Sequence, residues 1–413
     1  MKIIFKSFLI FNIFLFGISF NAKAKCAFNC KKIESKFKID DIYFPKYFFA
    51  KKINPQCKMV GKNHVLQFKD KDSNKFLREF VNYNWTEDHD KRSDSLYVFL
   101  EEISDRLNLI YGATINSMIN NTYDEEAILG GEILTLWAES NVMMDTINTP
   151  EIMALKKGTP GRRCYDGKGN IKAKCTWHTA QEAARYAGQF IINAILLKKK
   201  LSPVQIKIIN TYIQNLYTRH VSTWAKNARK NSLGFYQMAD GGISVLAYAH
   251  WMNDKKIAKE EFSIGFNEIN SVWYNDGYIN NNSFRGVKDI FYHTLGLNNA
   301  LGYIALAQEW DVKIPSRIQD KINNSVLAHK LGVEDLEKYR KRKFDGYLGN
   351  ATFNKKHARE HTHHEATFID WLELNYTNIN DVKFLDKDAM WHYRKGRKFT
   401  DRILGFNPKC IKK

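Results

Sequence analysis

The chain has 413 residues, and 63 lysines and arginines against 44 aspartates and glutamates give it a formal net charge of +19 at pH 7. This length allows one large core or two ordinary domains. The positive surplus favours a polyanionic partner, although an AT-rich genome would also enrich Lys, Asn and Ile. No nucleic-acid recognition motif is present, so a nucleic-acid partner is disfavoured.

Residues 1–24 have the pattern of a secretory signal peptide. Lys2 and Lys6 precede an apolar run over 8–20, and Ala22-Lys23-Ala24 forms a cleavage site of the A-x-A type. The run is too short for a good transmembrane span. We therefore expect a periplasmic or secreted protein with no stable membrane insertion; an uncleaved anchor is the alternative.

An even number of cysteines in an exported chain predicts disulfide bonds. Cys164 and Cys175 bracket a loop rich in Gly and Lys and are the expected local pair, while the full connectivity stays open. The six cysteines are Cys26, Cys30, Cys57, Cys164, Cys175 and Cys410.

The mature chain reads as an extended arm over 25–72 followed by a single helical domain over 73–413. Apolar residues recur at helical spacing from Ser73 onward, and strand-like alternation is scarce. Two longer connections, 157–177 and 342–363, are candidates for functional loops. The expected helices are 74–84, 94–120, 124–146, 178–198, 203–229, 240–251, 255–273, 284–309, 314–330, 334–341, 364–376 and 386–394.

Consecutive amphipathic helices joined by short connections pack as antiparallel pairs. The sequence therefore predicts an all-α fold. Closing such an array into a barrel of helical hairpins would leave a cleft at the end where loops converge.

The stretch 283–307 carries the leading candidate site. Ser283 is a natural N-cap, and Arg285 and Tyr292 lie seven residues apart, so they share one helix face with Lys288 close by. A cation beside a phenol lowers the pKa of the tyrosine and makes it usable as a base. His293 follows directly. The alternative is a buried tyrosine and a surface arginine on an ordinary amphipathic helix.

Two further places offer polar groups beside an expected helix start. Gln237 and Asp240 precede the pair Gly241-Gly242, which we expect to break the chain before a helix; Asp240 then contacts a ligand or serves as an N-cap. Trp177 and His178 precede another helix, where an aromatic face beside a titratable group suits a sugar subsite. A packed tryptophan beside a capping histidine is the alternative.

Each of the remaining polar clusters could bind a ligand or could simply be a solvent-exposed surface stretch. Lys69 and Lys71 could reach a polyanion, and the basic loop 157–177 could attract one. A histidine-rich stretch matches no metal-ligand spacing, so we expect neither a metal nor another cofactor. The loop carries Arg162, Arg163, Lys168, Lys172 and Lys174, and the histidine-rich stretch carries His357, His361, His363, His364 and Glu365.

A tyrosine with cations on a basic protein suits β-elimination of uronic-acid polymers. An arginine neutralises the uronate carboxylate and stabilises the enediolate-like transition state. One tyrosine can take the C5 proton and protonate the leaving O4 when both lie on the same face of the sugar. A glycoside hydrolase would instead need two carboxylates, for which Asp240 with Glu132 or Glu365 is available.

The order of these motifs resembles alginate lyases of polysaccharide lyase family 5. The segment RGVKDIFYH at 285–293 is similar to that family's RGxRALxYHNxAL motif, and LQFKDKDS, LTLWAESNVMM and FIDWLE resemble further segments in the same order. The resemblance implies an incomplete (α/α) toroid and metal-independent lyase activity. It also implies Tyr292 as base and acid, Arg285 on the substrate carboxylate, and Lys71 as a substrate-contacting lysine.

One departure from the family concerns its Asn-Asn-His segment at a helix start. This chain reads Gln237-Met238-Ala239-Asp240-Gly241 at the nearest equivalent place. His178 or His293 could supply the missing imidazole, and Asp240 could hold a proton or orient a neighbour. Because of this departure, other uronates such as glucuronan-like polymers are alternative substrates. A catalytically silent polyanion-binding protein on the same scaffold is an alternative function.

Overall fold

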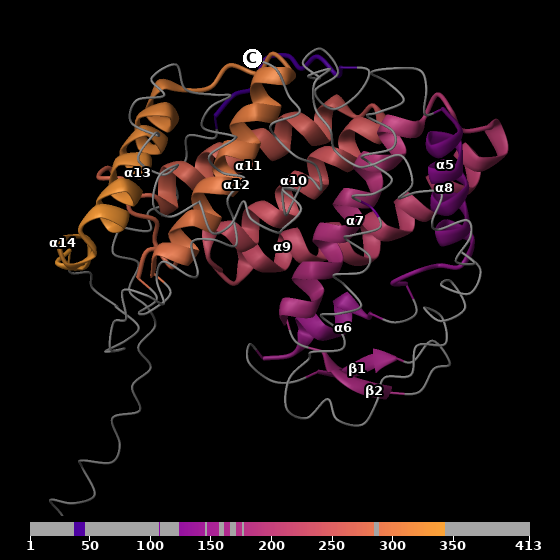
Figure 1. Cartoon of the computed structure of the whole chain (residues 1–413), viewed down its shortest axis with the longest axis horizontal. Coiled ribbons are helices and arrows are strands. Elements are labelled where there is room, and N and C mark those ends of the chain that lie inside the picture. The colour runs from indigo at the N-terminus through magenta and orange to yellow at the C-terminus, as the bar shows by residue number, and fades with distance from the viewer. Residues whose placement is uncertain are drawn as a thin grey trace, which may run out of the picture.

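The structure of the chain is a computed structural model (Figure 1). No helix among the residues it describes is long and apolar enough to cross a bilayer. The structure describes residues 37–45, 107, 124–144, 147–156, 161–165, 171–175, 177–284 and 289–342.

The described chain is mostly helical, which confirms the all-α class, with one short strand pair beside the helices. The expected helices 74–84, 364–376 and 386–394 lie outside it, as does 94–120 apart from the buried, helical Leu107. The elements are α5 (Asp124–Glu139), α6 (Thr149–Ala154), β1 (Gly161–Tyr165), β2 (Ile171–Cys175), α7 (Trp177–Leu197), α8 (Pro203–Leu216), the π-helical turn η3 (Tyr217–Val221), α9 (Ser222–Lys230), α10 (Phe235–Met252), α11 (Lys255–Val272), α12 (Asp289–Glu309), α13 (Ser316–Glu334) and α14 (Leu336–Arg340).

Helices α7 and α10 lie side by side and run in the same direction. Near their N-terminal ends, the side-chain amide of Gln181 donates to Asp240. At their C-terminal ends, Lys198 lies over the ring of Trp251, 4.5 Å from its centroid. Because the contacts advance together along both helices, the pair is parallel.

Helices α10 and α12 are parallel by the same argument. The rings of Tyr236 and Tyr292 are 5.4 Å apart at one end, and those of His250 and Trp310 are 5.7 Å apart at the other. These three helices form a buried layer: every residue of α7 from Thr179 to Leu197 is buried, and α12 is nearly as enclosed.

The helices that follow each member of this layer return in the opposite direction. Tyr217 of η3 stacks on Tyr248 near the end of α10, with ring centroids 3.7 Å apart, whereas Trp224 of α9 donates to the Gln237 carbonyl near its start. The segment 203–230 is therefore one helical rod against α10, as predicted apart from its π-helical turn. Consecutive helices thus pair as the predicted hairpins.

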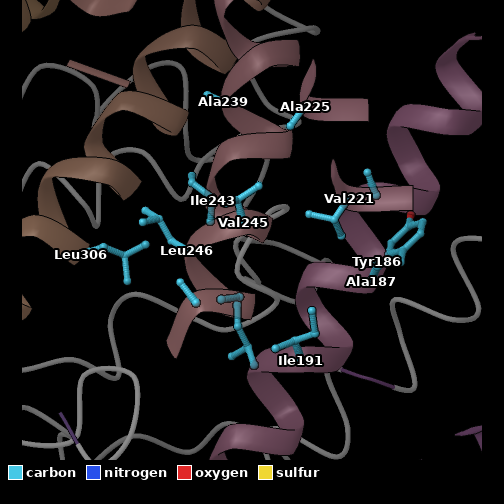
Figure 2. Close-up of a cluster of buried hydrophobic side chains, with 14 of the residues drawn as sticks. Tyr186, Ala187, Ile191, Val221, Ala225, Ala239, Ile243, Val245, Leu246 and Leu306 are labelled. Carbon is cyan, nitrogen blue, oxygen red and sulfur yellow. The ribbon is translucent and has the colours of Figure 1, made fainter. Parts of the chain in front are cut away.

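Small residues let the buried helices approach closely. A Cβ at Gly188 of α7 would overlap the side chain of Ser244 on α10. Around this contact, Figure 2 shows Ile191 of α7, Leu246 of α10 and Leu306 of α12 in one hydrophobic cluster. The core therefore lies between the members of the parallel layer.

A buried ion cluster joins α9, α10, α11 and α12. Arg229 contacts both oxygens of Glu261, at 2.5 and 3.0 Å, and donates to Glu268 at 2.7 Å. The Tyr303 hydroxyl donates to Glu261 at 2.6 Å. Gly242 of α10 lies directly against this cluster, and a Cβ there would overlap the Tyr303 hydroxyl and the Glu261 carboxylate.

The described part of the N-terminal arm, 37–45, crosses the C-terminal ends of α10 and α12. The backbone N–H of Tyr43 donates to the Trp310 carbonyl at 3.0 Å. His250 contacts the Pro45 carbonyl at 2.6 Å, and Phe44 packs edge-on against His250 and Trp310. The arm therefore covers the end of the layer opposite Asp240 and Tyr292.

Two predictions were wrong. Gly241 and Gly242 do not break the chain, because both lie inside α10, where their lack of a side chain accommodates α9 and the ion cluster. The expected loop 157–177 contains the antiparallel strands β1 and β2. In their register Cys164 faces Ala173 and Cys175 faces Gly161; the local disulfide stays a prediction.

We expect Gly242→Ala to lower the free energy of unfolding by about 2–4 kcal/mol, because the methyl group would force apart a buried ion cluster. Gly302→Ala on α12 is the matched control: its Cβ would come no closer than 3.3 Å, to Ile243. We expect it to stay within about 1 kcal/mol of the parent chain. Urea unfolding measures both, and equal stabilities would contradict the role of Gly242.

Candidate active site

The candidate site lies where the N-terminal halves of α7, α10 and α12 meet. Trp177 and His178 open α7 and are half-buried, as are Gln237 in the first turn of α10 and Tyr292 near the described start of α12. Parallel packing of the three helices brings these predicted residues, from three separate stretches of sequence, to one end of the buried layer.

Asp240 lies beneath this surface and is not an N-cap. Its carboxylate is buried and accepts from the side-chain amides of Gln181 on α7 and Asn299 on α12, the latter at 2.9 Å. The Asn299 amide nitrogen also donates to the Tyr236 carbonyl at 2.7 Å. Asp240 therefore binds neighbouring side chains across both helix interfaces.

Gln237 belongs to the same hydrogen-bonded chain. Its Oε1 accepts from the Gly234 backbone N–H at 3.2 Å, as in a capping box. Its Nε2 donates to Oε1 of Gln181 at 3.4 Å. The half-buried amide is thus fixed at both of its atoms.

His178 has a buried carboxylate behind it. Its Nε2 is 3.5 Å from Oε1 of Glu182, one turn along α7. Glu182 also accepts from Arg185, whose guanidinium is 3.0 Å from the Tyr186 hydroxyl. His178 remains half-exposed, with 38% of its side chain accessible, so the imidazole can reach both Glu182 and a ligand.

His293, which we predicted to contact substrate, is a core residue. It is completely buried. Its Nδ1 contacts the Tyr339 hydroxyl at 2.8 Å and the Ser283 hydroxyl at 3.1 Å, and its Nε2 contacts Ser325 at 2.8 Å. The same Ser283 accepts from the Ile279 N–H. His293 therefore holds α13 and α14 against α12.

Burial and the nearby His329 hold the pKa of His293 well below its usual range. Burial also lowers the pKa of His329 to about 4; its Nε2 is 2.8 Å from the Thr294 hydroxyl. Both histidines are neutral near pH 7.

Several predicted residues lie outside the described chain and keep the status of predictions. They include the cations expected on the substrate, the alternative carboxylate Glu365 and the histidine-rich stretch. Within the described chain, no group of three or more His, Cys, Asp or Glu residues is arranged to hold a metal. The predicted cations are Lys69, Lys71, Arg285 and Lys288.

The polar residues that hold the site together were not singled out from the sequence. Gln181, Glu182 and Arg185 follow His178 at three-, four- and seven-residue steps, which is a polar stripe on one helix face. In a helix as buried as α7, such a stripe indicates a network. Asn299, within an apolar helix, gave no comparable signal.

No protein-family model matches this chain, and a comparison with curated proteins finds no significant match.

We expect acid to destabilise the fold through its buried neutral histidines. A pKa held at about 4 for His329, against 6.5 when unfolded, means that the unfolded state takes up more protons below pH 6.5. The contribution of neutral His329 to the free energy of unfolding is therefore complete above pH 6.5 and is lost as the pH falls toward 4.

The His329→Gln variant isolates this effect. Between pH 7 and 5 the parent chain should lose about 2 kcal/mol more unfolding free energy than the variant. The comparison cancels the opposite effect of Glu268, whose pKa burial raises to about 7. Parallel pH profiles in urea unfolding would show that His329 titrates normally.

Proposed function

We propose that this protein is an exported polysaccharide lyase that cleaves a uronate-containing polymer by β-elimination. The observation that carries the proposal is the position of Tyr292: half-buried at the end of three packed helices, with the ring of Tyr236 5.4 Å away and a network of side-chain amides beneath.

Tyr292 is the proposed base and acid. In its phenolate form it takes the C5 proton of the uronate; the C4–O4 bond then breaks, a C4–C5 double bond forms, and the phenol returns the proton to O4. Arg285 is proposed to neutralise the carboxylate during this step. His178 is the proposed imidazole donor, since both ring nitrogens of His293 have protein partners.

The local charge distribution supports an anionic substrate. Trp177 and Gln237 lie in the first turns of α7 and α10, where the positive end of the helix dipole favours negative charge. The negative charge of Asp240 is taken up by the amides of Gln181 and Asn299. Asp240 is therefore proposed to orient its neighbours, and not to meet the substrate.

The same contacts make a glycoside hydrolase the weaker candidate. Asp240 is only 2% exposed and its two oxygens accept amide hydrogens from Gln181 and Asn299, which is a poor position for acting on a glycosidic bond. Glu132, the proposed second carboxylate, is an exposed residue of α5, which packs on α7 and α8. The alternation of buried and returning helices suits the incomplete (α/α) toroid that we propose as the full architecture.

We expect the purified protein to produce ultraviolet absorbance from the new double bond on alginate, polymannuronate or glucuronan. Tyr292→Phe should lower kcat by about 10²–10⁴-fold, because it removes the proton carrier and keeps the ring. Tyr248→Phe, the same change at the far end of α10, is the control and should stay within about twofold.

Activity retained by Tyr292→Phe would show that another group is the base. Absence of a signal on all three polymers would remove the lyase proposal in this form. New reducing ends without ultraviolet absorbance would instead identify a hydrolase.

A further inference from the structure

The hydrogen bonds around Asp240 form a series that begins at the backbone N–H of Gly234 and ends at the backbone carbonyl of Tyr236. Because these two backbone groups have fixed roles, the donor and the acceptor of every bond between them are fixed as well. At one end the Gly234 N–H can only donate, so Gln237 must turn Oε1 toward it. Gln237 then presents Nε2 to Gln181, which must answer with Oε1 and turn its own Nε2 toward Asp240.

On the Asn299 side of Asp240 the direction of the hydrogen bonds is also fixed. The Tyr236 carbonyl can only accept, so Asn299 must turn Nδ2 toward it, and the same nitrogen reaches Asp240 at 2.9 Å. Asp240 therefore meets a donor on each side. A carboxyl group accepts on both oxygens, whereas an asparagine here would place its own amide donor against one of the two neighbours.

We propose that Asp240 and Gln181 are positioning residues that fix the Gln237 amide with its second N–H facing the site, where it binds a carboxylate of the substrate. Gln237 is half-buried, and one of its amide hydrogens has no partner within the described part of the chain. This inference rests on the proposed function for its substrate, a uronate, but the direction of the hydrogen bonds is independent of it.

The role assigned to Asp240 differs from a general need for a carboxylate in the core. Swapping the amide and the carboxylate between positions 181 and 240 keeps every donor opposite an acceptor. In the double variant Gln181→Glu with Asp240→Asn, the amide at 240 donates to the carboxylate at 181, and the carboxylate at 181 also accepts from Gln237. The side chain at 240 still accepts from Asn299. Each single variant instead sets two donors or two acceptors against each other.

The first experiment is a double-mutant cycle on the mature chain, followed by thermal unfolding. Asp240→Asn and Gln181→Glu should each lower Tm by about 5 °C, and the double variant should recover most of that loss. If the two losses in Tm simply add in the double variant, the proposed donor–acceptor pattern is wrong. Additive losses are what one expects when each position needs only its native side chain.

The second experiment measures binding of uronate tetrasaccharides by calorimetry, in the Tyr292→Phe background so that no turnover occurs. Mannuronate and glucuronate oligomers are the probes, and their carboxyl-reduced forms are the neutral controls. Gln237→Met should weaken uronate binding about tenfold, because it removes a hydrogen bond to a charged group. It should leave binding of the neutral forms unchanged.

Gln205→Glu and Gln205→Met provide matched controls. Gln205 occupies the same capping-box position at the start of α8, where its Oε1 accepts from the Ser202 N–H at 2.9 Å. Neither change should alter uronate binding, whereas Gln237→Glu should abolish it and Asp240→Asn should weaken it about tenfold. The Gln181→Glu, Asp240→Asn pair should restore it.

The outcomes separate the two proposals. Uronate binding that depends on Gln237, without lyase activity on any polymer, would uphold this inference and remove the proposed reaction. Lyase activity with a KM insensitive to Gln237→Met would uphold the reaction and overturn the donor. Equal affinities for charged and neutral oligosaccharides would also overturn it.

Discussion

The fold depends on satisfying polar side chains inside helices that have no exposed face. Helix α7 is buried over nearly its whole length, so an amide or charge that it carries needs a partner within the protein, and leaving one unpaired costs about 1–3 kcal/mol. Gln181 donates across a helix interface to Asp240, whereas Nη2 of Arg185 contacts Glu182 on its own helix. The need for such partners constrains how the helices can rotate against one another.

Helix α10 occupies the centre of two such arrangements. On one side Asp240 accepts from amides of α7 and α12, and two residues later Gly242 faces the ion cluster around Arg229. Both arrangements resist rotation or sliding of α10, because charged hydrogen bonds lose much of their strength when their geometry changes. A site built on these helices has little freedom to shift, which suits chemistry that needs a tyrosine held in place.

Much of the helical architecture could be predicted, because hydrophobic spacing marks where helices lie and short connections make them pair. A common site for Gln237, Asp240 and Tyr292 was expected only through the resemblance to a known family, because hydrophobic spacing does not say which separate helices meet. What failed depends on three-dimensional packing. Spacing cannot distinguish a histidine facing a cleft from His293, which faces α13 and α14, and two adjacent glycines look like a break when they serve close packing within α10.

The π-helical turn Tyr217–Val221 has a consequence for the alignment of the chain. Its wider turn adds one residue between the buried stripe of α8, which ends at Leu216, and that of α9, which starts at Trp224. One residue corresponds to about 100° of helix rotation. A relative of this protein one residue shorter here would keep a continuous helix yet direct Arg229 away from Glu261, so lengths in this rod are constrained more tightly than the identities of its exposed side chains.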